Sequence, residues 1–152
     1  MQTRAREGDD LQEVPVFGVR VEGCPYIVRP SAYALVRNAS GEVAVVQTPR
    51  GCFLPGGGIE TGESPERAAE REAMEECGLV IDSLGSVGTA VELVHAPEEH
   101  ACFEKQCTFL TARLLRLAPV HEANHALAWL TLEDAIRRLS HGSHRWAVGR
   151  IG

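Results

Sequence analysis

The chain has 152 residues, of which 44% are hydrophobic and 24% are charged, a composition typical of one globular domain and not of a disordered chain. Acidic residues outnumber basic ones by 21 to 15, and the net charge of −6 argues against a protein that binds nucleic acid through a basic surface. No apolar run approaches the roughly 20 residues of a membrane helix, and the first ten residues are too polar for a secretory signal, so we expect a cytoplasmic protein with no membrane partner.

The first 60 residues predict an arm, several strands and a glycine-rich loop. Residues 1–13 are polar and lack periodicity, so we expect a flexible N-terminal arm there and a single domain over residues 14–152. Prolines interrupt the β-rich stretch that follows, and a turn cluster at residues 38–41 separates its last two strands. The expected strands are Val14–Val21, Tyr26–Val28, Ala32–Arg37 and Glu42–Gln47, with the glycine-rich loop at Leu54–Glu60.

Ser64 and Pro65 form the clearest helix start in the chain. Serine is a favourable N-cap, and proline fits the first helical position because it has no N–H to leave unpaired. Gly78 suits the left-handed conformation in which many helices end. We therefore expect a helix over Pro65–Cys77.

The second half of the chain predicts more strands and two shorter helices. Thr131 is the expected N-cap of a helix that carries Ala135 and Leu139, and residues 143–150 are expected to form a last short helix that packs Trp146 inward. The expected strands are Val80–Ile81, Thr89–His95, Gln106–Leu114 and Ala126–Leu130, with loops at 96–101 and 115–124. Together these elements predict one mixed α/β domain.

The cysteines give no sign of a cross-linked framework. They are five in number, which is odd, and no two have the C-x-x-C spacing: Cys24, Cys52, Cys77, Cys102 and Cys107. This pattern argues against a disulfide framework or a zinc ribbon. We expect small buried thiols in a reducing compartment.

Three glutamates of the expected helix, Glu72, Glu75 and Glu76, lie on one face, because residues three and four apart are neighbours on a helix surface. Their mutual repulsion is small only in open water or beside a cation. Oxygen ligands alone are typical of Mg²⁺ or Mn²⁺. The alternative is a solvated face in which Arg67 and Arg71 form ordinary ion pairs with the glutamates.

The segment GGIETGESPERAAEREAMEECGL, Gly57–Leu79, resembles the Nudix box of the Nudix hydrolases, G-x5-E-x7-R-E-U-x-E-E-x-G-U, in which U is a bulky aliphatic residue. Ala73 departs from the pattern at the first U position, which loses bulk and not chemistry. The matching positions are Gly57, Glu63, Arg71, Glu72, Glu75, Glu76, Gly78 and Leu79. The loop before the box and the strand around Trp129 are similar to the family as well.

The resemblance implies the fold class and the chemistry. It implies a MutT-like α/β/α sandwich, in which a mixed β-sheet is flanked by helices. It also implies hydrolysis of the pyrophosphate bond of a nucleoside diphosphate linked to a group X, with Mg²⁺ or Mn²⁺ as cofactor. Under this resemblance Glu75 and Glu76 would ligate the metal, Glu72 would add a ligand or act as the base, and the Gly56 carbonyl would supply a further metal oxygen.

The resemblance also implies roles for residues around these ligands. Arg71 would orient the carboxylates, and Glu63 would hydrogen-bond behind them. Gly57 and Gly58 would let the backbone approach the substrate phosphates, because glycine has no Cβ. Arg50, the arginine nearest the glycine-rich loop, is a further candidate for substrate binding.

Residues beyond the box are weaker candidates. Glu122, in the loop before the Trp129 strand, is the candidate for a late general base or an extra ligand, and an ordinary exposed glutamate is the alternative. Weaker candidates for the same role are Glu98, Glu99 and Glu104, because nothing in the sequence fixes the direction of their loop. We expect His121 and His125 to be structural or surface residues, and a phosphate contact from His144 or Arg145 to be a minor alternative.

The substrate is the least determined part of the prediction. The sequence lacks the strings that mark the NADH and coenzyme A pyrophosphatases of the family. A modified nucleoside triphosphate is our leading hypothesis, and a nucleotide-sugar or dinucleotide pyrophosphatase and a non-catalytic nucleotide-sensing module are the alternatives. We expect a small nucleotide as the partner, no nucleic acid, and a monomer or homodimer.

Overall fold

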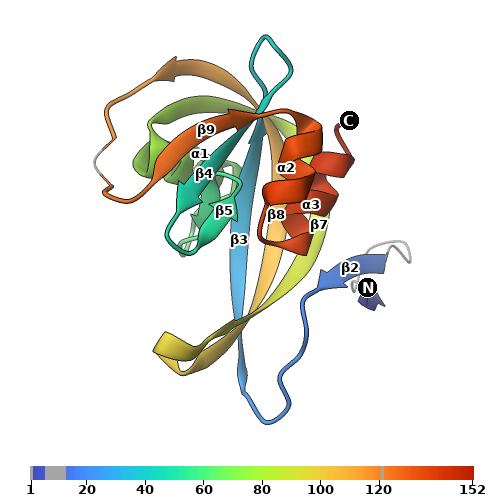
Figure 1. Cartoon of the computed structure of the whole chain (residues 1–152). Helices are drawn as coiled ribbons and strands as arrows, with labels where there is room; N and C mark the ends of the chain where they lie inside the picture. Colours follow the sequence, from blue (N-terminus) through green and yellow to red (C-terminus); the bar gives the residue numbers. More distant parts are fainter. Residues whose placement is uncertain (1, 6–12, 121) are drawn as a thin grey trace.

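The computed structural model describes residues 2–5, 13–120 and 122–152 (Figure 1). Within these residues the strands form two sheets, and both kinds of strand pairing occur. β2–β7 and β3–β8 are parallel pairs, and the other pairs are antiparallel. The larger sheet has the order β1 (Gln2–Ala5), β2 (Glu13–Phe17), β7 (Leu79–Ala96), β8 (Ala101–Leu117), β3 (Tyr26–Val36) and β6 (Gly56–Gly58), and the smaller has the order β5 (Gly51–Phe53), β4 (Val43–Thr48) and β9 (Ala126–Leu130).

Helices cover the sheets on two sides. Alternate residues of β3 belong to different cores, because successive side chains of a strand point to opposite faces. Tyr33 and Leu35 pack in the core that contains α2 (Leu132–Arg138) and α3 (Gly142–Gly149), and Ala32, Ala34 and Val36 pack in the core that contains α1 (Pro65–Cys77). The expected α/β/α sandwich with a mixed sheet is therefore confirmed.

The helix caps form as predicted. Ser64 Oγ accepts a hydrogen bond from the Arg67 N–H at 3.2 Å, and Gly78 ends α1 with φ of 71°. Thr131 Oγ1 accepts from the Asp134 N–H at 3.1 Å at the start of α2. The expected boundaries of α1 and of β9 are both confirmed, and none of the described helices is long and apolar enough to cross a membrane.

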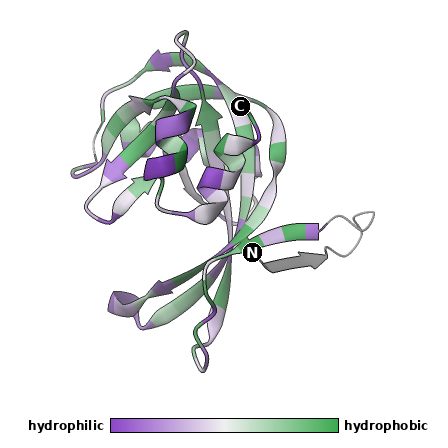
Figure 2. Cartoon of the chain, turned by 45° about the vertical axis from the view of Figure 1, so that its right-hand side comes forward, coloured by the Kyte–Doolittle hydropathy of each residue, from purple (hydrophilic) through white to green (hydrophobic). Residues whose placement is uncertain are grey.

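Several strands are longer than the sequence predicts. β3 runs through Pro30, whose carbonyl still accepts a hydrogen bond from the Ile59 N–H at 2.9 Å. β7 continues through Gly85 and Gly88 by means of shifts in its register with β8. In Figures 1 and 2 the long strands β3, β7 and β8 extend past the helices and form a projecting end of the molecule.

The N-terminal expectations need correction. β2 ends at Phe17, because Gly18 adopts φ of 91° and breaks the extended chain before Val21. Residues Gln2–Ala5 pair with Glu13–Val16 as an antiparallel strand, so this part of the expected loose arm is ordered. The rest of that arm lies outside the described residues.

The cysteine expectation is wrong for one pair. Cys24 and Cys102 form a disulfide with Cα atoms 6.2 Å apart, although they are 78 residues apart in sequence. The register of β3 with β8 causes this approach, because it places Tyr26 opposite Cys102. The remaining three cysteines are free and buried, as expected: Cys52, Cys77 and Cys107.

Candidate functional site

Arg71 is the centre of a hydrogen-bond network between α1 and β6. Its guanidinium donates two hydrogen bonds to the Glu63 carboxylate, at 2.8 and 3.0 Å, and one to Glu72 at 3.0 Å. It also donates to Glu75 at 3.4 Å and to the Gly58 carbonyl at 3.1 Å. The hydrogen bonds from Arg71 are the main cause that lowers the pKa of Glu63 to about 2. Arg71 therefore fixes carboxylates from both α1 and the loop before it.

Glu76 lies at the C-terminal end of α1 and faces β6. Its Oε1 accepts a hydrogen bond from the Gly56 N–H at 2.9 Å. Burial is the main cause that raises the pKa of Glu76 to about 8, and the charges of Glu72, Glu122 and Glu75 act in the same direction. A proton or a cation is thus favoured at this carboxylate.

Gly57 makes room for the Glu72 carboxylate. A Cβ atom at position 57 would lie 2.8 Å from Glu72 Cδ, whereas a Cβ at Gly58 would meet no atom within 4 Å. Burial raises the pKa of Glu72, and the hydrogen bond from Arg71 only partly opposes that effect. The Glu72 carboxylate therefore lies directly against the β6 backbone.

Glu122 comes from a different part of the chain and still lies near the α1 carboxylates. Its charge contributes to the raised pKa of both Glu72 and Glu76. Its carboxylate is 3.4 Å from Nδ1 of His125. His121 lies outside the described residues. The structure thus brings Glu122 toward the cluster from the segment before β9.

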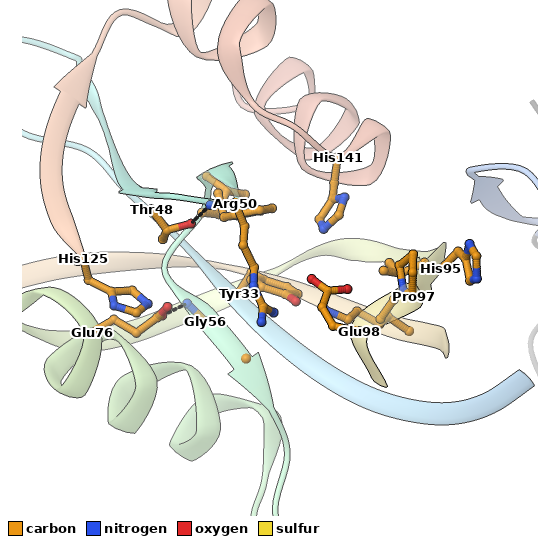
Figure 3. Close-up of a pocket in the computed structure, with 16 residues that line it drawn as sticks. Tyr33, Thr48, Arg50, Gly56, Glu76, His95, Pro97, Glu98, His125 and His141 are labelled. Atoms are coloured by element: carbon orange, nitrogen blue, oxygen red, sulfur yellow. Dashed lines mark hydrogen bonds between the residues drawn. The ribbon is translucent and has the colours of Figure 1, made fainter. Parts of the chain in front are cut away.

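A cavity of about 580 Å³ opens beside this cluster (Figure 3). Glu76, Gly56 and Gly57 line the side formed by α1 and β6. Arg50, in the turn between β4 and β5, projects into the same space as Glu98. The other lining residues are Tyr33, Thr48, Phe53, Leu54, Val94, His95, Ala96, Pro97, Lys105, His125 and His141.

Histidine and aromatic rings form the side opposite α1. His141 lines the cavity with its ring 5.0 Å from that of Phe53. His144 is fully buried behind it, and its Nδ1 accepts a hydrogen bond from the Leu54 N–H at 3.1 Å. Burial lowers the pKa of His141 to about 4 and lowers the pKa of His144 well below its usual value. Both imidazoles are therefore neutral at pH 7.

The minor expectation of a phosphate contact does not fit His144 or Arg145. His144 is buried among aromatic rings, 4.4 Å from the Tyr33 ring. The Arg145 guanidinium donates to the carbonyls of Leu139 and Ser140 and so joins α3 to the end of α2. Both residues are structural.

Of the weaker glutamate candidates, Glu98 lies at the cavity and Glu104 lies away from it. Glu98 lines the cavity, as a member of the short 3₁₀ turn Pro97–Glu99. Glu104 is buried and lies 3.6 Å from Arg20 on the projecting end of the sheet. The sequence analysis did not predict that Lys105 and His141 line the cavity. The position of Lys105 depends on the β7–β8 register, and that of His141 depends on how α3 packs.

The donor set on α1 fits a hard divalent cation. Carboxylate oxygens and a peptide carbonyl are the ligands that Mg²⁺ and Mn²⁺ prefer. Among the described residues no three α1 carboxylates have oxygens that all lie within 4.8 Å of one another. Arg71 holds Glu72 and Glu75, and the Gly56 N–H holds Glu76. A cation would relieve the repulsion between these carboxylates.

Comparison with known proteins points to the same family as the sequence motif does. A model of the NUDIX domain matches residues 28–148. Nudix hydrolase 4 of Arabidopsis thaliana is 40% identical over 79 residues, which cover 49% of this chain and 38% of that protein. Nudix hydrolase 21, chloroplastic, of the same plant is 29% identical over 140 residues, which cover 87% of this chain and 66% of that protein. The chain thus spans less than two thirds of the length of either relative.

The fold also matches solved structures. A NUDIX hydrolase from Nitrosomonas europaea superimposes with a TM-score of 0.67 at 15% identity, over 82% of this chain and 88% of that one. At this level of identity the likeness concerns the fold. The α/β/α sandwich found here is therefore shared with that protein.

Proposed function

The chain belongs to the Nudix domain family, and from this premise we propose that it is a divalent-metal-dependent pyrophosphohydrolase. The substrate is a nucleoside diphosphate linked to a further group, and a nucleoside triphosphate is our first choice. One observation carries the proposal: the Glu76 and Glu72 carboxylates meet the backbone of Gly56 and Gly57 at the edge of a 580 Å³ cavity that Glu76 lines, and Arg71 links Glu72 to Glu75. That volume suits a ligand of nucleotide size.

The metal is assigned to the acidic end of the cavity. Glu72, Glu75, Glu76 and the Gly56 carbonyl would hold Mg²⁺ or Mn²⁺. When bound, the ion would neutralise phosphate charge and make water a better nucleophile. Arg71 presents Glu72 and Glu75 through hydrogen bonds of 3.0 and 3.4 Å. Glu63 holds Arg71 in turn, so the orientation of the ligands depends on a residue outside the helix.

Two carboxylates can accept the proton of the attacking water. Glu72 lies against Gly57, at the side where the phosphates would approach. Glu122 lies outside the Arg71 network and close enough to influence Glu76. In either case the water oxygen attacks phosphorus, the bridging P–O bond breaks, and the carboxylate holds the proton.

The opposite side of the cavity binds the rest of the substrate. Arg50 projects into the cavity from the β4–β5 turn and supplies positive charge across from the α1 carboxylates (Figure 3). Lys105 adds a second cationic group. Phe53 and His141 offer ring faces beside them, which suit a flat base.

Phosphorus NMR of the reaction products in ¹⁸O-labelled water tests the proposal. The protein is incubated with Mg²⁺ and a panel of deoxynucleoside triphosphates, nucleotide sugars and dinucleotides. We expect cleavage of one class, with ¹⁸O on the attacked phosphorus. Binding without turnover would instead support the nucleotide-sensing module.

Glu76→Gln is the matched variant for the same assay. Loss of this carboxylate is expected to lower kcat by about 10²- to 10³-fold. Glu66→Gln is the control, because Glu66 is an exposed residue in the first turn of the same helix. Unchanged turnover in Glu76→Gln would remove the α1 cluster from the mechanism.

A further inference from the structure

A second group of metal-binding side chains lies at the projecting end of the sheet. Ligand atoms of Cys24, His95 and Cys102 all lie within 4.8 Å of one another. They come from three separate segments: the loop before β3, the end of β7 and the start of β8. Figure 1 shows that loop and the β7–β8 connection at the same end of the long strands.

Strand register sets this arrangement. Cys102 lies opposite His95 in the β7–β8 pair and opposite Tyr26 in the β3–β8 pair. Cys24 is two residues before Tyr26, so the β3–β8 register brings its sulfur to Cys102. Both neighbours of Cys102 are thus fixed by hydrogen-bonded strands and not by the disulfide alone.

The loop that carries Cys24 has its own anchors. The Tyr26 hydroxyl accepts a hydrogen bond from the Val21 N–H at 2.7 Å. The Arg20 guanidinium lies 4.6 Å from the centre of the Tyr26 ring and 3.6 Å from the Glu104 carboxylate. None of these contacts involves the cysteine sulfurs, so we expect Cys24 to stay near Cys102 in the reduced protein.

We propose that Cys24, Cys102 and His95 form a Zn²⁺ site in the reduced protein. Two thiolates and one imidazole form a ligand set that zinc prefers, whereas the α1 set contains oxygen alone. Cys102 is buried, Cys24 is half-buried and His95 is exposed, so the ion has a path from solvent. Three protein ligands leave the fourth tetrahedral position to water.

The disulfide and the zinc-bound form exclude each other. Two equivalents of a small thiol reduce the Cys24–Cys102 bond, and the products are two cysteine thiols and one small-molecule disulfide. Each cysteine then releases a proton to solvent as its sulfur binds Zn²⁺, and neutral His95 donates a nitrogen lone pair. An oxidant that re-forms the disulfide expels the ion.

The site is connected to the cavity through one of its ligands. His95 also lies at the edge of the cavity, next to Ala96, Pro97 and Glu98. Zinc at His95 therefore fixes the β7 end of that rim. The proposal does not depend on the reaction at α1, because the two ligand sets share no residue.

Cobalt titration of the reduced full-length chain tests the site. Co²⁺ bound to thiolates gives a sulfur-to-cobalt charge-transfer band and intense visible bands, whereas Co²⁺ at the α1 carboxylates gives neither. We expect one equivalent of Co²⁺ to produce these bands in the reduced protein and Zn²⁺ to displace it. The oxidised protein is expected to show no such bands.

Matched cysteine variants complete the test. Cys24→Ala is expected to abolish the bands, and Cys52→Ala, which removes a free buried thiol elsewhere, is expected to retain them. His95→Ala should weaken Co²⁺ binding at least about tenfold. In case a variant folds poorly, thermal unfolding of reduced wild type with and without Zn²⁺ gives a second measurement. Absence of the bands in reduced wild type, or their retention in Cys24→Ala, would overturn the proposal.

Discussion

The two sides of the cavity contain ionisable groups that burial affects in opposite directions. On the α1 side burial raises the pKa of Glu72 and Glu76. On the opposite side it lowers the pKa of His141 and His144. In both places burial favours the neutral form, which for a carboxyl is protonated and for an imidazole is deprotonated.

The two sides differ in how their polar atoms are satisfied. Neutral His144 accepts a hydrogen bond from the Leu54 N–H through Nδ1 and packs against the Tyr33 ring, whereas its buried Nε2 has no hydrogen-bond partner among the described residues. Glu76 accepts one hydrogen bond, from Gly56, and faces the charges of other carboxylates. The comparison is consistent with the cation proposed at the α1 side, whereas His144 is held by one hydrogen bond and by packing against aromatic rings.

Arg71→Lys is expected to disrupt the α1 side strongly although every carboxylate stays in place. Lysine keeps the positive charge but cannot bond Glu63 twice and also reach Glu72 and Gly58. Misplaced carboxylates are expected to lower kcat by about 100-fold, measured as nucleotide turnover with Mg²⁺. Arg67→Lys, at an exposed position one turn earlier, is the control. Equal activity of the two variants would contradict the role of Arg71.

His144→Phe tests the opposite side. Phenylalanine keeps a ring among Tyr33 and Phe109 but leaves the Leu54 N–H without its acceptor. A buried unpaired donor costs about 1–3 kcal/mol, so we expect a loss of about 2 kcal/mol in the free energy of unfolding, measured by urea denaturation. A free energy of unfolding equal to that of wild type would show that the hydrogen bond between Leu54 and His144 does not stabilise the fold.

The α1 side was predictable because its information is local. Glu63, Arg71 and Glu76 lie within 23 consecutive residues, and helical periodicity alone places the glutamates together. The caps that set the helix ends, Ser64 and Gly78, are local signals as well. The sequence therefore predicted both the helix boundaries and the cluster.

The opposite side and the cysteine pair depend on long-range register. Lys105 lines the cavity because β8 begins at Ala101 and places Lys105 opposite Glu92 of β7, whereas the sequence predicted a strand only from Gln106. Cys24 and Cys102 meet for a similar reason, through the β3–β8 register. Spacing in the sequence contains no information about either approach.

Gly57→Ala sharpens the comparison within the α1 side. The new Cβ would lie 2.8 Å from Glu72 Cδ, and the flexible carboxylate would move away from the β6 backbone. We expect kcat to fall about tenfold, which corresponds to about 1.4 kcal/mol, with little change in thermal unfolding. Gly58→Ala is the comparison, because its Cβ enters open space. An equal loss in both variants would point to the backbone and not to Glu72.

The smallest expected effect is a pH dependence that separates the two sides. The pKa of Glu76 rises from 4.5 to about 8 on folding, so between these values the folded state binds more protons than the unfolded state. The free energy of unfolding of the metal-free protein therefore falls as pH rises through this range. The histidines act with the opposite sign, because their pKa values fall from 6.5 on folding and their contribution is lost only as pH drops below 6.5.

Between pH 6.5 and 8 the two histidines are neutral in both the folded and the unfolded state. Within this interval the free energy of unfolding therefore changes with the protonation of Glu76 and not with that of the histidines. We expect wild type with a chelator present to lose about 1 kcal/mol across this interval relative to Glu76→Gln, in urea denaturation at several pH values. Excess Mg²⁺ should remove the difference in slope, since an ion beside Glu76 favours the charged carboxylate. Parallel curves for the two proteins without metal would mean that Glu76 is already charged at neutral pH. The α1 side would then not need a cation to offset burial, and the contrast between the two sides would disappear.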